Sequence, residues 1–469
     1  MSILKKKKIY MIGIKGVGMT MLAQYLVGNG LEVSGSDVEE DFATTKDVLS
    51  RLDITVVNNF SINNIPSDAD LIIYSSAYNA DRNEEVRAAL AGKIKTLTYA
   101  EAMGEIFNEN YGIAVVGSHG KTTTTAWLGY VLEKAKKNPS VMVGSRVPQF
   151  DGASLVGKSD LLVIEADEYQ NKLRFFNPRG VLLNNIDYDH PDFFKTKDDY
   201  EKVFAEFLKK IPKKGFLVAN FDDKVVQRVA LEDCFGKVIS YGLENKEADY
   251  MAYDIKQGVD RQFFKVKIKE DDEFGFGGEL GSFSIRLLGR HSISNALAVI
   301  AAATELGVEL KDIREYLYEF LGTVRRLETM GKYKGAIIID DYAHHPTEIK
   351  TTIAGVRKNY QEKKIVVVFH PHTFTRTNGL LNEFSESFDE ADELIVLDIY
   401  GSAREEQGGV HSNDIINKIK KRSPSFTCTY IPTLMECEEY LRKNLNGNEV
   451  VLLMGAGDVF RIGEGLVNS

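Results

Sequence analysis

Short apolar runs that end in glycine or in polar residues recur along the chain, and they predict the buried strands of parallel sheets. The predicted strands occupy residues 8–12, 71–74, 114–116, 161–164, 181–183, 336–339, 365–369, 394–397 and 450–454. Between strands, apolar residues recur at helical spacing, as at Met21, Leu22 and Leu26. This alternation predicts an α/β fold built from βαβ units. Residues 242–283 read instead as strands separated only by turns, which predicts an antiparallel flank.

Two stretches interrupt this alternation. Residues 107–112 contain a polar Asn-Glu-Asn-Tyr-Gly segment directly before a predicted strand, and residues 324–328 lie between a predicted helix and a new strand. A chain of 469 residues is also too long for a single hydrophobic core. We therefore expect a domain boundary at each stretch.

Composition and charge narrow the class of protein. A net charge of −10 disfavours broad binding to nucleic acid or to anionic membranes. No run of 18 apolar residues occurs, and the basic start of the chain lacks the apolar core and cleavage site of a signal peptide. The three cysteines lie far apart or lack ligand partners, which indicates a reducing compartment and no metal cluster. We expect a cytoplasmic protein.

The most informative segment joins the strand at 114–116 to a helix. It consists of Gly117, Ser118, His119, Gly120, Lys121, Thr122 and Thr123. Backbone amides at a helix start favour an anion, so the segment suits a polyphosphate. Lys121 can reach the terminal phosphates, and the Thr122 hydroxyl can hold Mg²⁺. Its glycines are closer together than in the common G-x-x-x-x-G-K-[ST] loop, and the alternative is a plain turn that caps the helix.

Acidic residues follow two predicted strands near this loop. The strand at 161–164 runs into Glu165-Ala-Asp-Glu168, and the strand at 181–183 runs into a segment that ends in Asp189-His190. Ends of neighbouring parallel strands share one edge of a sheet, where Mg²⁺ beside phosphates would need carboxylates. The alternatives are a surface Asp–His contact and a His190 that only orients a ligand.

The first βα turn has the features of a nucleotide site. Gly13, Gly16 and Gly18 follow the strand at 8–12, Asp37 ends the next strand, and Ser75 and Ser76 follow the strand at 71–74. Glycines let backbone approach a pyrophosphate, and the acid can meet a ribose or a base. The glycine order G-x-x-G-x-G disfavours a nicotinamide cofactor, and a purely structural turn is the alternative.

Polar residues also gather in the last third of the chain. Arg290, His291 and Asn295 open an apolar helix that Ser292 or Ser294 can cap, a suitable place for a nucleotide. Arg325 and Arg326 can bind phosphate or can be a solvated pair. Four later strands end in polar residues, which predicts a site at one edge of a third sheet. The spacing of His344, His345, His370 and His372 disfavours zinc.

Together these motifs resemble the Mur ligase family over nearly the whole chain. The resemblance rests on Gly-Ser-His-Gly-Lys-Thr-Thr (117–123), Glu-Ala-Asp-Glu (165–168), Asn-Ile-Asp-Tyr-Asp-His (185–190), Gly-Arg-His (289–291) with Asn295, Arg-Arg (325–326) and Asp-Asp-Tyr-Ala-His-His-Pro-Thr-Glu (340–348). Within the family, residues 13–19, 370–377 and 454–458 are similar to those of members that attach L-alanine.

The resemblance implies three domains: a UDP-sugar-binding Rossmann-like domain (1–108), a central P-loop ATPase domain with the antiparallel flank (109–325) and a C-terminal Rossmann-like domain that binds the amino acid (326–469). It implies an ATP- and Mg²⁺-dependent ligase of peptidoglycan precursor synthesis. ATP would phosphorylate the lactyl carboxylate of UDP-N-acetylmuramate, and the amine of L-alanine would displace the phosphate. A monomer or weak homodimer with small-molecule substrates is implied.

The resemblance also assigns roles to residues. The metal ligands would be Thr122, Glu165 (or Glu168) and His190. ATP would contact residues 117–123 together with Asn295, Arg326 and Asp341, the last at the ribose. The UDP pyrophosphate would face Gly16, Gly18 and Met19, with Gly13, Asp37, Ser75 and Ser76 in the same site. Tyr342, His344 and Arg376 would frame alanine, and the catalytic residues would be Lys121, His190, His344 and Arg376.

Two departures from the family pattern bear on the substrate. Thr373 stands where many relatives have arginine, so alanine would meet one arginine, Arg376. Tyr169-Gln170 replaces a common Ser-Asp. That tyrosine, together with Asn184-Asn185 and Asp189-His190, is similar to the related ligase that attaches a recycled tripeptide. Two further classes of protein stay open, a P-loop ATPase that drives a partner and a dinucleotide oxidoreductase. The polar strand ends of the third domain disfavour the ATPase.

Overall fold

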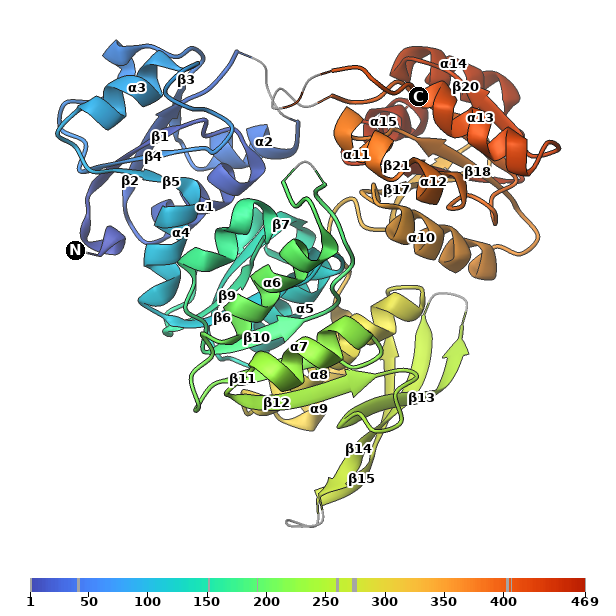
Figure 1. Ribbon diagram of the computed structural model, residues 1–469, viewed down its shortest axis with the longest axis horizontal. Helices are drawn as coiled ribbons and strands as arrows, with labels where there is room; N and C mark the ends of the chain where they lie inside the picture. The colour runs from blue at the N-terminus through green and yellow to red at the C-terminus, as the bar shows by residue number, and fades with distance from the viewer. Residues whose placement is uncertain are drawn as a thin grey trace.

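The computed structural model describes residues 2–39, 43–150, 152–191, 193–258, 261–271, 276–401, 405 and 407–468. Three sheets flanked by helices form three lobes, and Figure 1 shows the first and third lobes side by side above the central one. The predicted α/β fold class is confirmed. Within the described ranges, each helix is too short or too polar to cross a membrane.

The first lobe is a five-stranded parallel sheet in the order β3-β2-β1-β4-β5. Ile12, the last residue of β1, pairs with Ser36 on one side and Tyr74 on the other, so the glycine turn, Asp37 and Ser75 share one edge. The elements are η1 (Ile3–Lys5), β1 (Lys8–Ile12), α1 (Val17–Gly28), β2 (Glu32–Ser36), α2 (Ala43–Arg51), β3 (Thr55–Val57), η2 (Ile62–Asn64), β4 (Leu71–Tyr74), α3 (Glu84–Ala91), β5 (Thr96–Thr98) and α4 (Tyr99–Asn108).

The central lobe contains a ten-stranded sheet in the order β15-β14-β13-β12-β11-β10-β6-β9-β7-β8. β6, which leads into the phosphate loop, lies between β10 and β9, the two strands with acidic ends. β13, β14 and β15 pair antiparallel, which confirms the predicted flank. The elements are β6 (Tyr111–Val116), α5 (Lys121–Lys134), β7 (Ser140–Val147), η3 (Pro148–Phe150), β8 (Gly152–Leu155), β9 (Leu161–Glu165), η4 (Tyr169–Phe175), β10 (Gly180–Leu183), α6 (Lys197–Leu208), β11 (Phe216–Asn220), α7 (Lys224–Asp233), β12 (Lys237–Gly242), β13 (Tyr250–Gln257), β14 (Gln262–Asp271), β15 (Phe276–Ile285), α8 (Arg290–Glu305) and α9 (Leu310–Glu319).

The third lobe has a six-stranded sheet in the order β16-β17-β21-β18-β19-β20, parallel except for the β16–β17 pair. Asp341, at the end of β17, pairs with Met454 of β21, and Phe369 of β18 pairs with the same residue, so the predicted polar ends meet at one edge. The elements are β16 (Glu328–Tyr333), β17 (Ala336–Asp341), α10 (Pro346–Asn359), β18 (Lys364–Phe369), α11 (Phe374–Gly379), α12 (Leu381–Ser385), β19 (Glu393–Val396), α13 (Ser412–Arg422), β20 (Thr427–Tyr430), α14 (Leu434–Asn444), β21 (Glu449–Met454) and α15 (Phe460–Val467).

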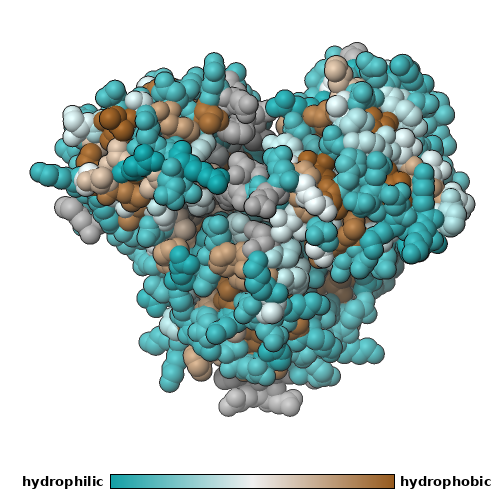
Figure 2. Space-filling model, turned by 45° about the horizontal axis from the view of Figure 1, so that its top comes forward, coloured by the Kyte–Doolittle hydropathy of each residue, from teal (hydrophilic) through white to brown (hydrophobic). Residues whose placement is uncertain are grey.

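The lobes meet in two different ways. The first and central lobes share one hydrophobic core, and the Gln24 side-chain oxygen accepts from the amides of Ala153 and Ser154, each at 3.1 Å. The third lobe keeps its own core and meets the central lobe through polar side chains. Figure 2 shows the first and third lobes as separate projections above the central one. The sheet edges that carry the predicted site residues therefore face an interface of polar side chains between the central and third lobes.

Candidate active site

The phosphate loop has the backbone geometry of an anion site. Gly120 precedes α5 in the left-handed region with φ of 79°, a conformation that favours glycine. A Cβ there would lie 2.8 Å from the side-chain oxygen of Asn295 and 3.0 Å from the side-chain nitrogen of Asn184. The first amides of the 14-residue helix α5 have no partner within the helix, so they can bind phosphate oxygens.

Lys121 lies folded over the loop. Its ammonium donates to the carbonyl of Gly117, to the carbonyl of Ser118 at 3.3 Å and to Glu168 at 2.9 Å. Burial opposes the charge of Lys121, but the neighbouring carboxylates of Glu168 and Asp167 outweigh it and raise the lysine pKa. The ammonium is therefore a fixed positive charge beside the loop amides.

The acidic residues at the strand ends have two separate sets of partners. The Thr122 hydroxyl donates to Glu165 at 2.8 Å, whereas Glu168 is bound by Lys121 and by the Tyr200 hydroxyl at 2.9 Å. His190 lies 3.8 Å from Glu168. Because Lys121 neutralises Glu168, Glu165 is the better partner of Thr122 for a cation. Hydroxyl and carboxylate oxygens are the ligands that Mg²⁺ prefers, so this donor set fits the implied metal.

A cavity of about 970 Å³ separates the central and third lobes beside this loop. It is lined by His119, Gly120 and Thr123 at the loop, and by the three predicted ATP residues Asn295, Arg326 and Asp341. These residues come from the loop before α5 and its first turn, from α8 and from the start of the third lobe. The structure thus brings distant parts of the chain around one space large enough for a nucleotide.

The two arginines and two aspartates at this boundary differ in environment. Arg325 is buried, donates to Asp340 at 2.9 Å and to the carbonyl of Gly455 at 2.7 Å, and so holds the lobe together. Arg326 instead lines the cavity and lies 3.4 Å from the Thr122 hydroxyl. Burial raises the pKa of Asp341 to about 6, although Arg326 opposes that rise. Asp341 accepts the amides of Leu327 and Ala343.

The predicted residues of the first lobe lie together at the sheet edge. Asp37 is buried and accepts the amide of Lys15 at 2.7 Å and the Tyr78 hydroxyl at 3.0 Å. Gly13 has φ of 81°, and Gly16 precedes helix α1. Met19 packs its side chain in the core, so only its backbone can face a ligand. Ser76 is exposed, and the Ser75 hydroxyl accepts the amide of Ala77 at 3.3 Å.

The residues expected to frame an amino acid lie at the edge of the third sheet. Arg376 makes a bidentate pair with Asp189 of the central lobe, at 3.1 and 3.3 Å, and the two side chains are 8% and 7% exposed. His344 donates from Nδ1 to the carbonyl of Tyr342 at 3.0 Å, which leaves Nε2 as an acceptor. Burial lowers the pKa of His344 to about 3. Thr373, the position that departs from the family, caps α11 and binds the amide of Arg376.

The start of helix α8 differs from the prediction made from its sequence. The helix begins at Arg290 after Gly289, and no side chain caps it, so the prediction of a Ser292 or Ser294 cap was wrong. Ser292 instead donates to the carbonyl of Leu288 at 2.7 Å. His344 and His372 have ring centres 6.1 Å apart. Among the described residues, one candidate metal group joins Asp167, Glu168 and His190 of the central lobe, and a second joins His345 to residues of the central lobe.

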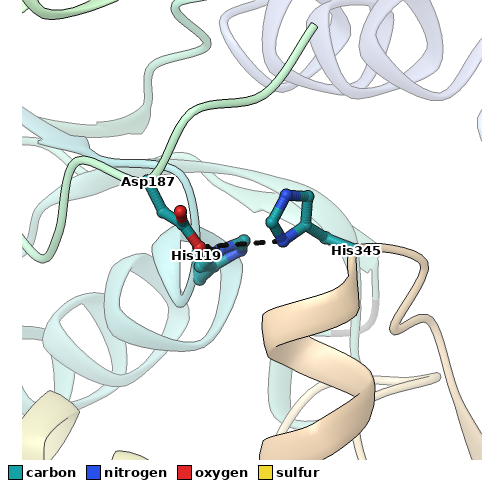
Figure 3. Close-up of side chains that lie close together, drawn as sticks. All are labelled: His119, Asp187 and His345. Atoms are coloured by element: carbon teal, nitrogen blue, oxygen red, sulfur yellow. Dashed lines mark hydrogen bonds and ion pairs between the residues drawn. The ribbon is translucent and has the colours of Figure 1, made fainter. Parts of the chain in front are cut away.

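That group consists of His119, Asp187 and His345 (Figure 3). His119 Nε2 lies 3.1 Å from Asp187, and its Nδ1 lies 3.2 Å from Glu348 of α10. Burial opposes the charge of the ring, but the two carboxylates outweigh it and raise the pKa of His119 to about 9. The ring between these two carboxylates forms an ionic bridge between the lobes.

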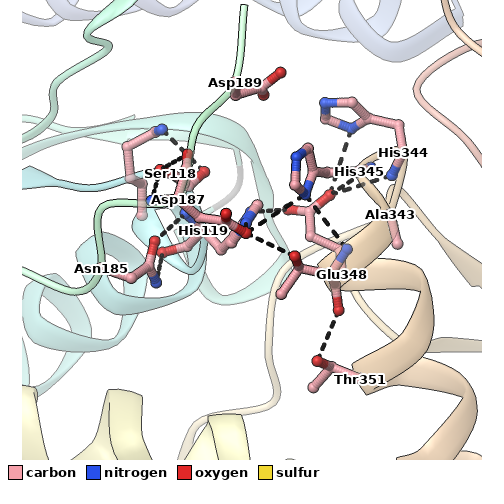
Figure 4. A network of polar contacts seen from close by, with 12 residues as sticks. Ser118, His119, Asn185, Asp187, Asp189, Ala343, His344, His345, Glu348 and Thr351 are labelled. Atoms are coloured by element: carbon pink, nitrogen blue, oxygen red, sulfur yellow. Dashed lines mark hydrogen bonds and ion pairs between the residues drawn. The ribbon is translucent and has the colours of Figure 1, made fainter. Parts of the chain in front are cut away.

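Figure 4 shows this bridge as part of a wider network across the junction. The Thr347 hydroxyl donates to Asp187 at 2.6 Å, beside the contact of Glu348 with His119. Reasoning from sequence gave no role to Thr347 or Glu348, and it placed Asp187 and Asp189 only among the acidic residues expected beside Mg²⁺, although each lies inside a quoted motif. Their spacing along the chain carries no information about partners from another lobe.

The His119 bridge predicts a pH dependence of stability. The pKa of the folded state, about 9, lies above the ordinary value of 6.5, so the bridge stabilises the fold fully below about pH 6.5. This contribution is lost as pH rises through 9. We expect the difference in unfolding free energy between wild type and His119→Gln to be largest near pH 6 and to shrink towards pH 10. Urea unfolding at several pH values measures it; a constant difference would contradict the bridge.

Comparison with known proteins accounts for this architecture. Three family models match in order: "Mur ligase family, catalytic domain" (8–111), "Mur ligase middle domain" (115–303) and "Mur ligase, glutamate ligase domain" (325–457). The chain is 38% identical over 461 residues to a UDP-N-acetylmuramate–L-alanine ligase of Desulfitobacterium hafniense, covering 98% of this chain and 99% of that one. It is 39% identical over 469 residues to the enzyme of that name from Clostridium kluyveri, covering 99% of each.

Solved structures have the same fold as this chain. The crystal structure of a UDP-N-acetylmuramate-alanine ligase, MurC, from Thermotoga maritima matches with a TM-score of 0.79 and 26% identity, covering 98% of both chains. A murein peptide ligase from Psychrobacter arcticus shares the fold, with a TM-score of 0.74 and 22% identity over 98% of both chains. With relatives this similar over the full length and the three domain models in order, the chain belongs to the Mur ligase family.

Proposed function

We propose that this protein is an ATP-dependent ligase that joins L-alanine to the lactyl carboxylate of UDP-N-acetylmuramate in peptidoglycan precursor synthesis. The observation that carries the proposal is the full-length similarity to alanine ligases at 38–39% identity. The phosphate loop beside a cavity of about 970 Å³ supports the use of ATP. Residues 1–108 would bind the UDP-sugar, residues 109–325 the ATP and residues 326–469 the amino acid.

The first step makes the carboxylate reactive. A carboxylate oxygen of the substrate attacks the γ-phosphorus of ATP, the bond from that phosphorus to the β-γ bridging oxygen breaks, and ADP leaves an acyl phosphate behind. Lys121 and the loop amides stabilise the charge that develops on the transferring group. Asn295, Arg326 and Asp341 hold the nucleotide in the cavity.

The metal ion fits the residues present. Thr122 and Glu165 would hold it beside the phosphates, and His190 would complete the site. When bound, Mg²⁺ neutralises charge on the phosphate oxygens. Glu165 also accepts the amide of Gly144 at 2.6 Å, so its carboxylate is held in place.

The second step forms the amide. The neutral amine of alanine attacks the acyl carbon, and the tetrahedral intermediate expels inorganic phosphate, which leaves with the proton that the nitrogen gives up. Arg376 would pair with the carboxylate of alanine. The Nε2 lone pair of His344 would accept a hydrogen bond from the amine, because Nδ1 is committed to the carbonyl of Tyr342. Tyr342 would form the wall of this pocket.

A direct assay tests the proposal. ADP release is measured with ATP, Mg²⁺ and UDP-N-acetylmuramate, together with L-alanine or with the L-alanyl-γ-D-glutamyl-meso-diaminopimelate tripeptide. We expect release with alanine only, accompanied by one phosphate and one amide product per turnover. Release with the tripeptide alone would overturn the proposal in favour of a recycling ligase, which the full-length relatives do not favour. Release without any muramate substrate would indicate a P-loop ATPase of another class.

A further inference from the structure

Glu348 lies where the phosphate loop and the amino-acid segment meet. It is the third residue of α10 (Pro346–Asn359), and its side chain is only 12% exposed. In Figure 4 its carboxylate points from the start of α10 towards His119 of the central lobe. Neither step of the proposed reaction uses it.

The two oxygens of Glu348 face different parts of the site. Oε1 lies 3.2 Å from His119 Nδ1 and 3.7 Å from Arg326 Nη1. These partners belong to the phosphate loop and to the cavity wall. Oε2 accepts the amide of His344 at 3.2 Å and the amide of His345 at 3.4 Å. These partners belong to the segment that frames the amino acid.

Helix capping explains only half of these contacts. Glu348 forms a capping box with His345, which uses Oε2 and which glutamine satisfies as well as glutamate. The Oε1 contacts require a negative charge, because both partners are cations. Burial opposes that charge, yet His119 and Arg326 hold the pKa of Glu348 well below its ordinary range. A full charge is thus kept in a buried place, which a cap alone does not need.

We propose that Glu348 is a positioning residue that couples the phosphate loop to the amino-acid segment across the two lobes. It fixes His119 and Arg326 with one oxygen and His344 with the other. ATP and the amino acid are therefore aligned for reaction only while its carboxylate is present. The inference rests on the proposed function. It extends that function, because it assigns the alignment of the two substrates to a residue of the cavity wall that takes part in neither reaction step.

Glu348→Gln separates the charge from the cap. The amide keeps the capping contacts and the volume but removes the charge that holds His119 and Arg326. We expect kcat to fall about 10- to 100-fold, the range for losing a charged hydrogen bond. The KM for UDP-N-acetylmuramate should stay within about 2-fold of wild type. The matched control is Glu362→Gln, an exposed glutamate of the same lobe, which should leave kcat unchanged.

A double-mutant cycle supplies the decisive measurement. If Glu348 acts through His119, the kcat of the double variant Glu348→Gln/His119→Asn should be no more than about 2-fold below that of the worse single variant. If the losses of kcat in the two single variants multiply in the double variant, the proposal is overturned. A Glu348→Gln enzyme with wild-type kcat would overturn it as well. Glu348→Asp, which keeps the charge, should recover part of the activity and serves if the glutamine variant fails to fold. Wild type is assayed first, so an enzyme inactive with alanine refutes the proposed function and not this coupling.

Discussion

Lys121→Ala is expected to reduce acyl-phosphate formation by about 10³-fold, the upper range for removing one preorganised donor. The lysine ammonium sits among the carbonyls of Gly117 and Ser118 and the carboxylate of Glu168, so no rotation is needed to present its charge at the loop. Alanine removes this charge and also leaves Glu168 without its cation in a buried position. The variant should therefore lose both phosphoryl transfer and the charge balance of the loop.

The measurement is ADP release at saturating substrates, together with trapping of the acyl phosphate in the absence of alanine. Lys134→Ala is the matched control, because Lys134 ends the same helix and is exposed. It should retain wild-type activity. Thermal unfolding of both variants shows whether the fold survives. Residual ligation above about a tenth of wild type in a folded Lys121→Ala enzyme would disprove the assignment of the loop.

Arg376→Ala is expected to lower kcat/KM for the amino acid by about 10²- to 10³-fold, corresponding to about 3–4 kcal/mol. The guanidinium is the proposed partner of the substrate carboxylate, and it also pairs with Asp189 across the lobes at 3.1 and 3.3 Å. Removing it leaves Asp189 buried and uncompensated, a position in which arginine holds the aspartate pKa well below its ordinary range despite burial. Both binding of the amino acid and the approach of the lobes should weaken.

Steady-state kinetics at varied alanine check this expectation, and the KM for ATP should change much less. Arg422→Ala, which removes an exposed arginine paired with Asp389 in the same lobe, is the control and should be near wild type. Adding Asp189→Asn to Arg376→Ala should restore part of the lost stability, because it removes the unpaired charge. An unchanged kcat/KM for alanine in Arg376→Ala would place the amino-acid carboxylate elsewhere.

Local patterns determined much of this protein. The apolar run at 114–116, the two glycines and the Lys-Thr pair predicted strand, loop and helix, because each depends on neighbours within a few residues. The acidic ends after 161–164 and 181–183 predicted a shared edge, and the sheet places β6 between β9 and β10. The antiparallel flank followed from strands without helices between them. Such features need only backbone geometry and the periodicity of burial.

The tertiary structure decided which side chains of these motifs pair, both within the central lobe and between lobes. Sequence motifs grouped His190 with Thr122 and with either Glu165 or Glu168; folding pairs Thr122 with Glu165 and places His190 beside Glu168. His119 was predicted for the phosphate side, yet both of its ring nitrogens face carboxylates, one of them from α10. Partners separated by more than 200 residues are chosen by how two lobes pack, and no local pattern encodes that packing. Burial then sets which carboxylates stay charged, and so which residues can act.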